Sequence, residues 1–215
     1  MRLYIIRHGE TTANSEGLLQ GWTDNPLNEN GIALAEETGR ALQGTVFHLC
    51  YSSPLARARK TAEIILRESG NGRTPVQTDE RLKEIHMGEW EKKRFRPEER
   101  EVDPEKIRRF FTNPFYLDRC PGGESAVEVC DRTQAFLREL AEADSDENCL
   151  IATHGFALRA MLNCLYENPK DFWHGHVPYN CTINIVEAGN GVLRLLEEDL
   201  VLYKTEQCID RYAEF

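Results

Sequence analysis

Leu3-Tyr4-Ile5-Ile6-Arg7-His8-Gly9-Glu10 opens the chain with a short apolar run that ends in an arginine, a histidine and a glycine. The run over residues 2–7 predicts a buried β-strand with His8 at its exit. A neutral imidazole is a nucleophile near pH 7, and the planar guanidinium of Arg7 offers a fork for phosphate oxygens. Gly9 would let the backbone come close to a bound group. The stretch therefore predicts a strand end suited to attack on a phosphate.

The rest of the chain alternates similar apolar runs with amphipathic helical patterns. Asn28 can cap the first helix, and Gly189-Asn190-Gly191 is a strong hairpin signal. Besides the first strand, we expect strands at residues 46–51, 76–78 and 148–154, helices at about 30–43, 55–68, 125–143 and 155–166, and hairpin strands at 181–187 and 192–196. This alternation predicts an α/β fold, a three-layer α/β/α sandwich with a mainly parallel central sheet.

One stretch interrupts the alternation. Residues 92–120 are polar, irregular and punctuated by prolines, which favours one or two short helices outside the core. A chain of 215 residues has the size of one α/β domain. We therefore expect a single domain over residues 1–215 with a lid-like excursion at about 92–120.

Three polar segments directly follow expected strands, namely His8, Ser52-Ser53 and His154. Ligands of such sheets bind beyond the carboxyl ends of the strands. The sequence therefore predicts that these segments share one site.

Composition and charge restrict the partners. Hydrophobic content of 40% and charged content of 29% are typical of a globular protein, and a net charge of −10 argues against nucleic-acid binding. No run reaches transmembrane length, and the first residues become charged too soon for a signal peptide. We expect a cytoplasmic protein with neither a nucleic-acid nor a membrane partner.

The cysteines and the remaining histidines favour structural roles. Seven cysteines are dispersed without a C-x-x-C pair, as is typical of reduced and mostly buried thiols. The spacing of His174, His176 and Cys181 matches no zinc pattern, so we expect neither a metal nor another cofactor. His48 and His86, like His174 and His176, are expected to serve the structure.

Four motifs, in order along the chain, resemble the signatures of the histidine phosphatase (phosphoglycerate mutase-like) superfamily. They are Arg7-His8-Gly9-Glu10, the S-P-L turn with the helix start at residues 52–62, the acidic segment at residues 82–91, and Ala152-Thr153-His154-Gly155. The resemblance spans residue 2 to about 182. It implies a phosphoglycerate mutase-like fold and an enzyme that acts on phosphate esters.

The resemblance also implies roles for single residues. His8 maps to the nucleophile that carries the phosphoryl group as a phosphohistidine, Glu84 to the acidic proton donor, and His154 to the second active-site histidine. The phosphate contacts that it implies are Arg7, Asn14, Gln20 and Arg57. Gly155 begins a helix, whose N-terminal amides would also favour an anion.

Phosphoryl transfer requires such a set on chemical grounds. Negative charge develops on three equatorial oxygens, so several donors must converge, and Arg7, Arg57 and a protonated His154 could supply them. The ring nitrogen of His8 that does not attack should donate to a fixed acceptor such as a backbone carbonyl. Because these groups compensate the charge, we expect a metal-independent phosphomonoesterase of the histidine acid phosphatase type.

The proton donor is assigned by motif register. Glu84 would protonate the leaving oxygen and later accept a proton from water. Glu89 and Glu91 lie nearby and compete for this assignment.

The acceptor of the phosphoryl group separates mutases, which must exclude water, from phosphatases, which must admit it. Residues 92–109 hold eight basic and five acidic side chains, a net charge of +3, while the remaining chain carries −13. This segment is either a positive patch that draws in anionic substrates or a solvated face of mixed charge. Within it, Arg108-Arg109 resembles the paired arginines with which cofactor-dependent phosphoglycerate mutases hold the substrate carboxylate.

Other features favour the phosphatase branch. Pro121-Gly122-Gly123-Glu124-Ser125 is similar to a segment of phosphatase members, and Asn14 and Gln20 also suit them. We therefore expect a phosphomonoester hydrolase for small phosphorylated metabolites. A cofactor-dependent phosphoglycerate mutase is the alternative, and α-ribazole phosphatase is one specific hydrolase among the candidates.

Two further interpretations concern partners. A regulatory module that only binds a phosphorylated ligand would lack His8 or His154, and both are present. The terminal hairpin offers a sheet edge for a second copy of the chain, so a homodimer is an expectation without a direct sequence signal.

Overall fold

The computed structural model describes residues 1–143, 145–204, 206 and 212, and its centre is one six-stranded sheet. The strand order is β3-β2-β4-β1-β5-β6. The strands are β1 (Arg2–Arg7), β2 (Leu49–Ser52), β3 (Val76–Thr78), β4 (Asn148–Thr153), β5 (Ile183–Gly189) and β6 (Val192–Leu200). The first four strands pair in parallel, and the hairpin β5–β6 adds two antiparallel strands at one edge. The predicted mainly parallel sheet is confirmed.

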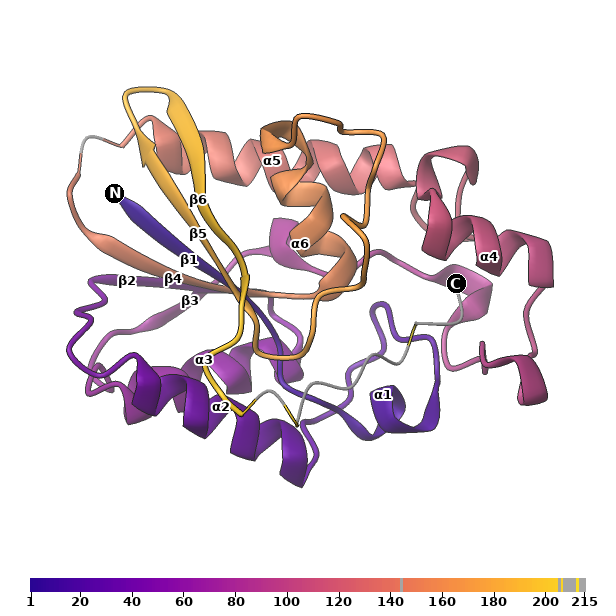
Figure 1. Ribbon diagram of the computed structural model, residues 1–215, viewed down its shortest axis with the longest axis horizontal. Helices are drawn as coiled ribbons and strands as arrows, with labels where there is room; N and C mark the ends of the chain where they lie inside the picture. Colours follow the sequence, from indigo (N-terminus) through magenta and orange to yellow (C-terminus); the bar gives the residue numbers. More distant parts are fainter. Residues whose placement is uncertain (144, 205, 207–211, 213–215) are drawn as a thin grey trace.

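Helices cover both faces of the sheet (Figure 1). The helices are α1 (Thr12–Glu16), α2 (Glu29–Ala41), α3 (Ala56–Glu68), α4 (Pro104–Thr112), α5 (Ala126–Ala141) and α6 (Gly155–Leu162). In β1, Ile6 packs on the side of α2 and α3, whereas Leu3 and Ile5 pack on the side of α5 and α6. This alternation follows from the two-residue period of a strand, and it confirms the three-layer sandwich.

Side-chain caps set the starts of the expected helices. Asn28 accepts a hydrogen bond from the Gly31 amide at 2.8 Å, and Ser125 forms a capping box with Glu128 at the start of α5. The short helix α1 begins after a second capping box, between Thr11 and Asn14. A helix of five residues carries too little periodicity to be expected from the sequence.

Several element bounds differ from the expectation. The second strand begins at Leu49 instead of residue 46, because Asn71 holds the preceding backbone: its Oδ1 accepts from the Phe47 amide, and its Nδ2 donates to the Thr45 carbonyl. The strand expected from residue 181 begins at Ile183, since Cys181 has a left-handed φ of 59°. The final helix ends at Leu162 and continues as a short 3₁₀ turn.

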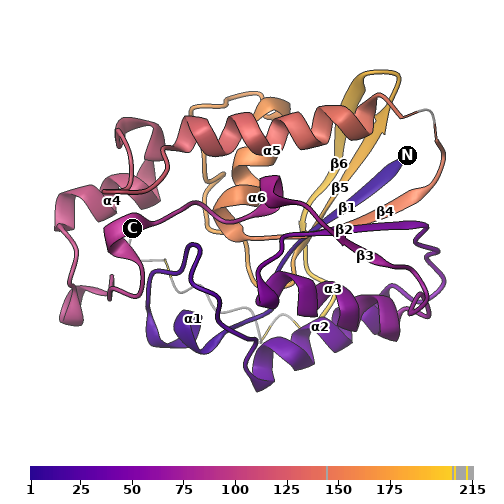
Figure 2. The ribbon, with the colours of Figure 1, turned by 180° about the vertical axis from the view of Figure 1, so that it is seen from behind.

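The expected excursion lies beside the carboxyl ends of the parallel strands, with α4 as its main element (Figures 1 and 2). Asp103 caps α4, and the 3₁₀ turns Pro97–Glu99 and Pro114–Tyr116 flank it. Ile107 and Phe110 are buried in an apolar cluster with residues of α5 and α6. The helix therefore turns its apolar face toward the sandwich and its charged face toward solvent.

The structure also bears on the thiols and the membrane. All six cysteines that the structure describes are free, and five of them are buried, as expected for reduced thiols; Cys208 lies outside the described residues. Within the described part of the chain, no helix is both long and apolar enough to span a bilayer.

Candidate active site

The three segments predicted to share a site do so. The strands β2, β4 and β1 are neighbours in the sheet, and their last residues lie at the same level, with Arg7 opposite Thr153. His8 follows β1, Ser53 follows β2 and His154 follows β4, so all three leave the sheet at one edge. The ring centroids of His8 and His154 are 5.1 Å apart, close enough for both rings to contact one phosphate.

The His8 ring is held in one tautomer. Its Nδ1 lies 2.7 Å from the Gly9 carbonyl oxygen, so Nδ1–H donates there and Nε2 keeps its lone pair. Burial, Arg57 and Arg7 hold the pKa of His8 well below its usual 6.5. The backbone acceptor that the sequence analysis expected is therefore present, and His8 is a neutral imidazole with a nucleophilic nitrogen at neutral pH.

Gly9 is needed for a different reason than the one expected. A Cβ atom on Gly9 would stand 2.5 Å from the carbonyl oxygen of Gly31 in α2. The protein's own helix α2 therefore makes a close approach that requires glycine at this position. The Gly9 amide also donates to Thr61 Oγ1 at 3.0 Å, which ties the His8 turn to α3.

Arg57 lies between the two histidines. It is fully buried, and its Nε lies 3.3 Å from His8 Nε2 and 3.1 Å from His154 Nδ1, so one N–H is shared between two imidazole lone pairs. The terminal nitrogens donate to the carbonyls of Thr23 and Gly21 at 2.8 and 2.7 Å. Burial lowers the pKa of Arg57 to about 10, which still leaves it cationic at neutral pH.

His154 differs from the protonated donor that was expected. Its Nδ1 accepts from Arg57, and its Nε2 contacts Ser53 Oγ at 2.8 Å. Burial and the charge of Arg57 hold the pKa of His154 well below its usual value, so the ring is neutral in the resting site. A phosphate nearby would favour the charged form, because an opposite charge raises the pKa of an imidazole.

Glu84 occupies the helix N-terminus that was expected to help bind phosphate. Its Oε1 accepts from the Ala157 and Ile85 amides at 2.9 Å, and its Oε2 accepts from the Phe156 amide at 3.2 Å. The positive end of α6 thus faces the protein's own carboxylate. Burial raises the pKa of Glu84 above its usual 4.5, although these amides and Arg57 oppose the shift.

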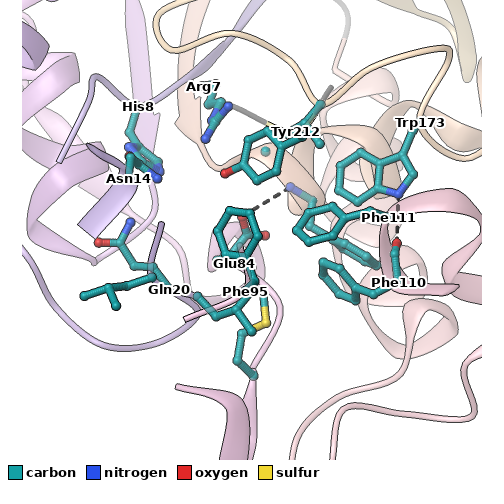
Figure 3. A pocket seen from close by; sticks show the side chains of 16 residues that line it. Arg7, His8, Asn14, Gln20, Glu84, Phe95, Phe110, Phe111, Trp173 and Tyr212 are labelled. Carbon is teal, nitrogen blue, oxygen red and sulfur yellow. Dashed lines mark hydrogen bonds between the residues drawn. The ribbon is translucent and has the colours of Figure 1, made fainter. Parts of the chain in front are cut away.

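The remaining predicted phosphate contacts line the same pocket, as Figure 3 shows for Arg7, Asn14 and Gln20. One terminal nitrogen of Arg7 donates to the Pro178 carbonyl, while its buried Nε has no hydrogen-bond partner among the described residues. Asn14 Oδ1 accepts from the Thr11 amide at 3.1 Å and Gln20 Oε1 accepts from Asn25 Nδ2 at 2.8 Å, so the NH₂ groups of Asn14 and Gln20 are left to donate. Buried donors of this kind suit an anionic ligand.

The lack of a side chain at Gly155 leaves room for the guanidinium of Arg7. A Cβ atom there would lie 3.3 Å from Arg7 Nε, tighter than most such contacts. The first residue of α6 thus lines the pocket beside an unpartnered donor.

Comparison with known proteins agrees with this arrangement. Residues 3–199 match the histidine phosphatase superfamily, branch 1. The chain belongs to this family.

Relatives in the histidine phosphatase superfamily have different named activities. Over 188 residues the chain is 35% identical to "Probable phosphoglycerate mutase GpmB" of Salmonella choleraesuis, covering 87% of this chain and 85% of that protein. Among solved structures, it is similar to YhfR of Bacillus stearothermophilus, with 34% identity, a TM-score of 0.83, and coverage of 92% and 96% of the two chains. It is also similar to the alpha-ribazole phosphatase of Shigella flexneri, with 27% identity, a TM-score of 0.78, and coverage of 93% and 96%. The family thus supports an enzyme of the phosphatase or mutase kind.

The sequence analysis missed a supporting residue of this histidine phosphatase site. Glu91 accepts hydrogen bonds from the Trp22 amide at 2.7 Å, from the Thr23 hydroxyl at 2.6 Å, and from the Gly21 and Thr23 amides at 3.2 Å. Burial would raise the pKa of Glu91, but these bonds outweigh it and lower the pKa. Because Gly21 and Thr23 hold Arg57, Glu91 fixes the loop that positions the guanidinium.

A second support holds the Glu84 segment. Arg132 in α5 donates to the carbonyls of Lys83 and Glu84 at 2.7 and 2.9 Å and pairs with Glu124 at 2.9 Å. Glu124 belongs to the Pro-Gly-Gly-Glu-Ser segment that the sequence analysis noticed only as a family resemblance. No signal in the sequence indicated the contacts of Arg132 with Lys83 and Glu84, because these residues lie almost fifty positions apart.

The excursion of the histidine phosphatase fold does not bring its arginines to the pocket. Arg108 and Arg109 are exposed, and Arg109 pairs with Glu105 one turn away at 2.5 Å. Arg94 pairs with Glu99 at 2.8 Å. These pairs fit the alternative in which the segment is a solvated face of mixed charge. The likeness of Arg108-Arg109 to a carboxylate clamp is wrong, because both side chains lie on the solvent face of α4.

His174 and His176 are not among the residues that line the pocket beside His8. His174 Nδ1 is 3.3 Å from Glu198, and His176 Nε2 is 3.3 Å from Asp199, two carboxylates that also pair with the buried Arg159. Among the residues that the structure describes, no group of three or more His, Cys, Asp or Glu side chains is arranged as a metal site.

Proposed function

We propose that the protein is a phosphomonoester hydrolase that acts on small phosphorylated metabolites through a phosphohistidine on His8, without a metal. The observation that carries this proposal is the tautomer of His8: Nδ1 is committed to the Gly9 carbonyl, and Nε2 lies in a pocket beside buried cationic donors. Such donors stabilise the charge of a transferring phosphoryl group in the way that a metal does in other enzymes.

In the first half-reaction, the substrate phosphate is held by Arg7, Arg57 and the amides of Asn14 and Gln20. His8 Nε2 attacks phosphorus, and the bond from phosphorus to the ester oxygen breaks. The leaving oxygen takes a proton from Glu84, whose raised pKa favours the protonated form that a general acid needs.

In the second half-reaction, a water molecule attacks the phosphohistidine. Glu84, now a carboxylate, accepts the proton of that water, the P–N bond breaks, and inorganic phosphate leaves. The bound phosphate charge raises the pKa of His154, so this ring becomes a donor to phosphate oxygens while the ligand is present.

The scarcity of positive side chains in the pocket lining favours hydrolysis over mutase activity. Of the described residues that line the pocket, Arg7 alone has a positive side chain, and it lies at the phosphate end. A phosphoglycerate substrate also carries a carboxylate, which would have no cation to pair with farther along the pocket. An α-ribazole phosphate, whose alcohol half carries an aromatic base, suits the aromatic lining better and is the second candidate.

Product analysis separates the two reactions. The enzyme is incubated with 3-phosphoglycerate and 2,3-bisphosphoglycerate in the presence of a chelator, beside a panel of phosphomonoesters. A hydrolase releases inorganic phosphate from the panel and forms no 2-phosphoglycerate. Accumulation of 2-phosphoglycerate without phosphate release would contradict the proposal.

The rate should follow a bell-shaped pH profile set by His8 and Glu84. On the acid side, kcat/KM falls as His8 is protonated, which occurs well below pH 6.5 because its pKa is depressed. On the alkaline side, it falls as Glu84 loses its proton, above the usual 4.5 because its pKa is raised. Stopped assays of ethyl phosphate hydrolysis across pH measure both limbs. If Glu84→Gln still showed the fall in kcat/KM on the alkaline side, that fall would have to come from the ionisation of the substrate and not from Glu84.

Glu84→Gln should show an effect that depends on the leaving group. For ethyl phosphate we expect kcat/KM to fall by about 10²–10³-fold, since an alkoxide cannot leave without a proton. For p-nitrophenyl phosphate the loss should be much smaller, because that phenolate leaves unprotonated. Glu89→Gln, at an exposed glutamate in the same segment, is the matched control and should change neither rate. Equal losses on both esters would remove Glu84 from the role of proton donor.

A further inference from the structure

The pocket has two chemically different ends (Figure 3). The end beside His8 carries the polar groups that would hold phosphate. The other end is aromatic, with Phe95, Phe110, Phe111, Trp173 and Tyr212 around it, and Phe156 packs behind Phe110. The alcohol half of a bound phosphomonoester would point toward this second end.

Part of the aromatic end is fixed by the core. Phe110, Phe156 and Trp173 are almost fully buried, and the rings of Phe110 and Phe156 stack with centroids 5.2 Å apart. Trp173 Nε1 donates to the Phe110 carbonyl at 2.9 Å, which ties the segment after α6 to α4. These rings therefore form a preorganised wall.

The rim of the aromatic end joins two distant parts of the chain. The Tyr212 ring stacks on Phe95 with a centroid distance of 5.4 Å and an interplanar angle of 8°, and it lies 5.1 Å from the Phe111 ring. Phe111 and Tyr212 are half-buried, and both line the pocket. Tyr212 thus brings a residue near the C-terminus to the pocket, while residues 205, 207–211 and 213–215 lie outside the described part of the chain.

The aromatic side chains of this end disfavour substrates whose alcohol half is polar. A polyol or carboxylate placed against the rings would lose its hydrogen bonds to water without gaining replacements. A flat apolar ring would instead gain burial and stacking contacts with Phe111 and Tyr212.

We infer that the aromatic end is a subsite for an aromatic ring in the alcohol half of the substrate, and that Phe111 and Tyr212 set this preference. The inference rests on the proposed function, because it treats the ligand as a phosphomonoester. It narrows the substrate class to esters whose alcohol half carries an aromatic ring, and it disfavours glycerate phosphates and sugar phosphates that lack one.

Binding of non-hydrolysable analogues tests the subsite apart from the chemistry. Calorimetric titration with 2-phenylethylphosphonate and ethylphosphonate compares two ligands with the same phosphonate group. We expect the wild type to bind the phenyl ligand at least about tenfold more tightly, the effect of one good ring contact with its burial. Equal affinity for the two ligands would overturn the inference.

Hydrolysis of the matching esters tests the residues. 2-Phenylethyl phosphate and ethyl phosphate both release primary alcohols, so the ratio of their kcat/KM values reports contacts with the alcohol half and not leaving-group chemistry. Phe111→Ala and Tyr212→Ala should each lower this ratio by about tenfold. Tyr116→Ala, at an exposed tyrosine of the same excursion, should leave the ratio unchanged.

The outcomes separate this inference from the proposed function. Because Phe111→Ala could weaken the apolar cluster, Phe111→Leu, which keeps apolar volume but removes the flat ring, is the second variant. Ratios unchanged in Phe111→Leu and Tyr212→Ala would contradict the inference even while hydrolysis proceeds. A preference for the phenylethyl phosphonate without hydrolysis of any ester would instead overturn the proposed function and leave the subsite standing.

Discussion

Replacing His8 with alanine is expected to lower kcat/KM for phosphomonoester hydrolysis by about 10⁴-fold or more, the scale on which enzymes lose activity without their nucleophile. His8 is buried and lines the pocket, and its Nε2 is the ring nitrogen that keeps a lone pair, because Nδ1–H donates to the Gly9 carbonyl. His154 is not among the residues that line the pocket, and its Nε2 contacts Ser53, so we do not expect it to replace His8.

The matched control for this variant is His48→Ala. His48 is exposed and precedes β2, so its loss should change kcat/KM by less than about twofold, as is usual for surface positions. Steady-state assays of both variants, with near-ultraviolet circular dichroism to check folding, decide the matter. A folded His8→Ala protein with wild-type activity would exclude the proposed nucleophile.

Arg57→Ala is expected to cost about 10³-fold in kcat/KM. A fixed electrostatic donor typically contributes about 10²–10³-fold, and this one also orders both histidines. The change also leaves the Gly21 and Thr23 carbonyls without their buried partner, which should lower the free energy of unfolding by about 1–3 kcal/mol. Binding of vanadate, measured beside kcat/KM, should weaken in parallel.

Arg57→Lys separates charge from geometry. A lysine keeps the positive charge but cannot reach two carbonyls and two imidazoles at once, so most of the activity should be lost. Arg59→Lys is the control, because Arg59 lies on the exposed side of α3 and pairs with Glu63. If Arg57→Lys were as active as Arg59→Lys, the shared hydrogen bond to the histidines would have no catalytic part.

The arrangement of strands was accessible from the sequence because it depends on local patterns. The apolar run before His8 and the one before His154 have the length and composition of buried strands, and parallel strands in one sheet must end at the same edge. Motif register then identified Arg57 and Glu84 among several arginines and glutamates. In both cases the structure brings the chosen side chain to the pocket region.

Features of the site that depend on contacts between distant segments could not be predicted from the sequence. Nothing near Glu91 in sequence indicates that its carboxylate organises residues 21–23, and nothing near residue 212 indicates a place in the pocket. The neutral state of His154 in the resting site was also not accessible, because burial and Arg57, almost a hundred positions away, lower its pKa. The outward direction of Arg108 and Arg109 depends on which face of α4 packs, and Phe110 decides that by entering the apolar cluster.

At the start of α6, two of the helix N-terminal amides bind a carboxylate of the protein itself. An anion does lie at the start of α6, as the helix dipole favours, but it is the carboxylate of Glu84. The same contacts hold the acid that would protonate the leaving group against the second and third residues after His154, so they help fix the second histidine and the acid relative to each other.

Trapping the covalent intermediate tests the central claim most directly. The enzyme is mixed with radiolabelled p-nitrophenyl phosphate, quenched within milliseconds in alkaline detergent, digested, and its labelled peptide mapped by mass spectrometry. We predict label on the peptide that contains His8, stable in alkali, lost in acid and missing from His8→Ala. Phosphate release with the label on another residue, or with no labelled protein at any quench time, would contradict the account.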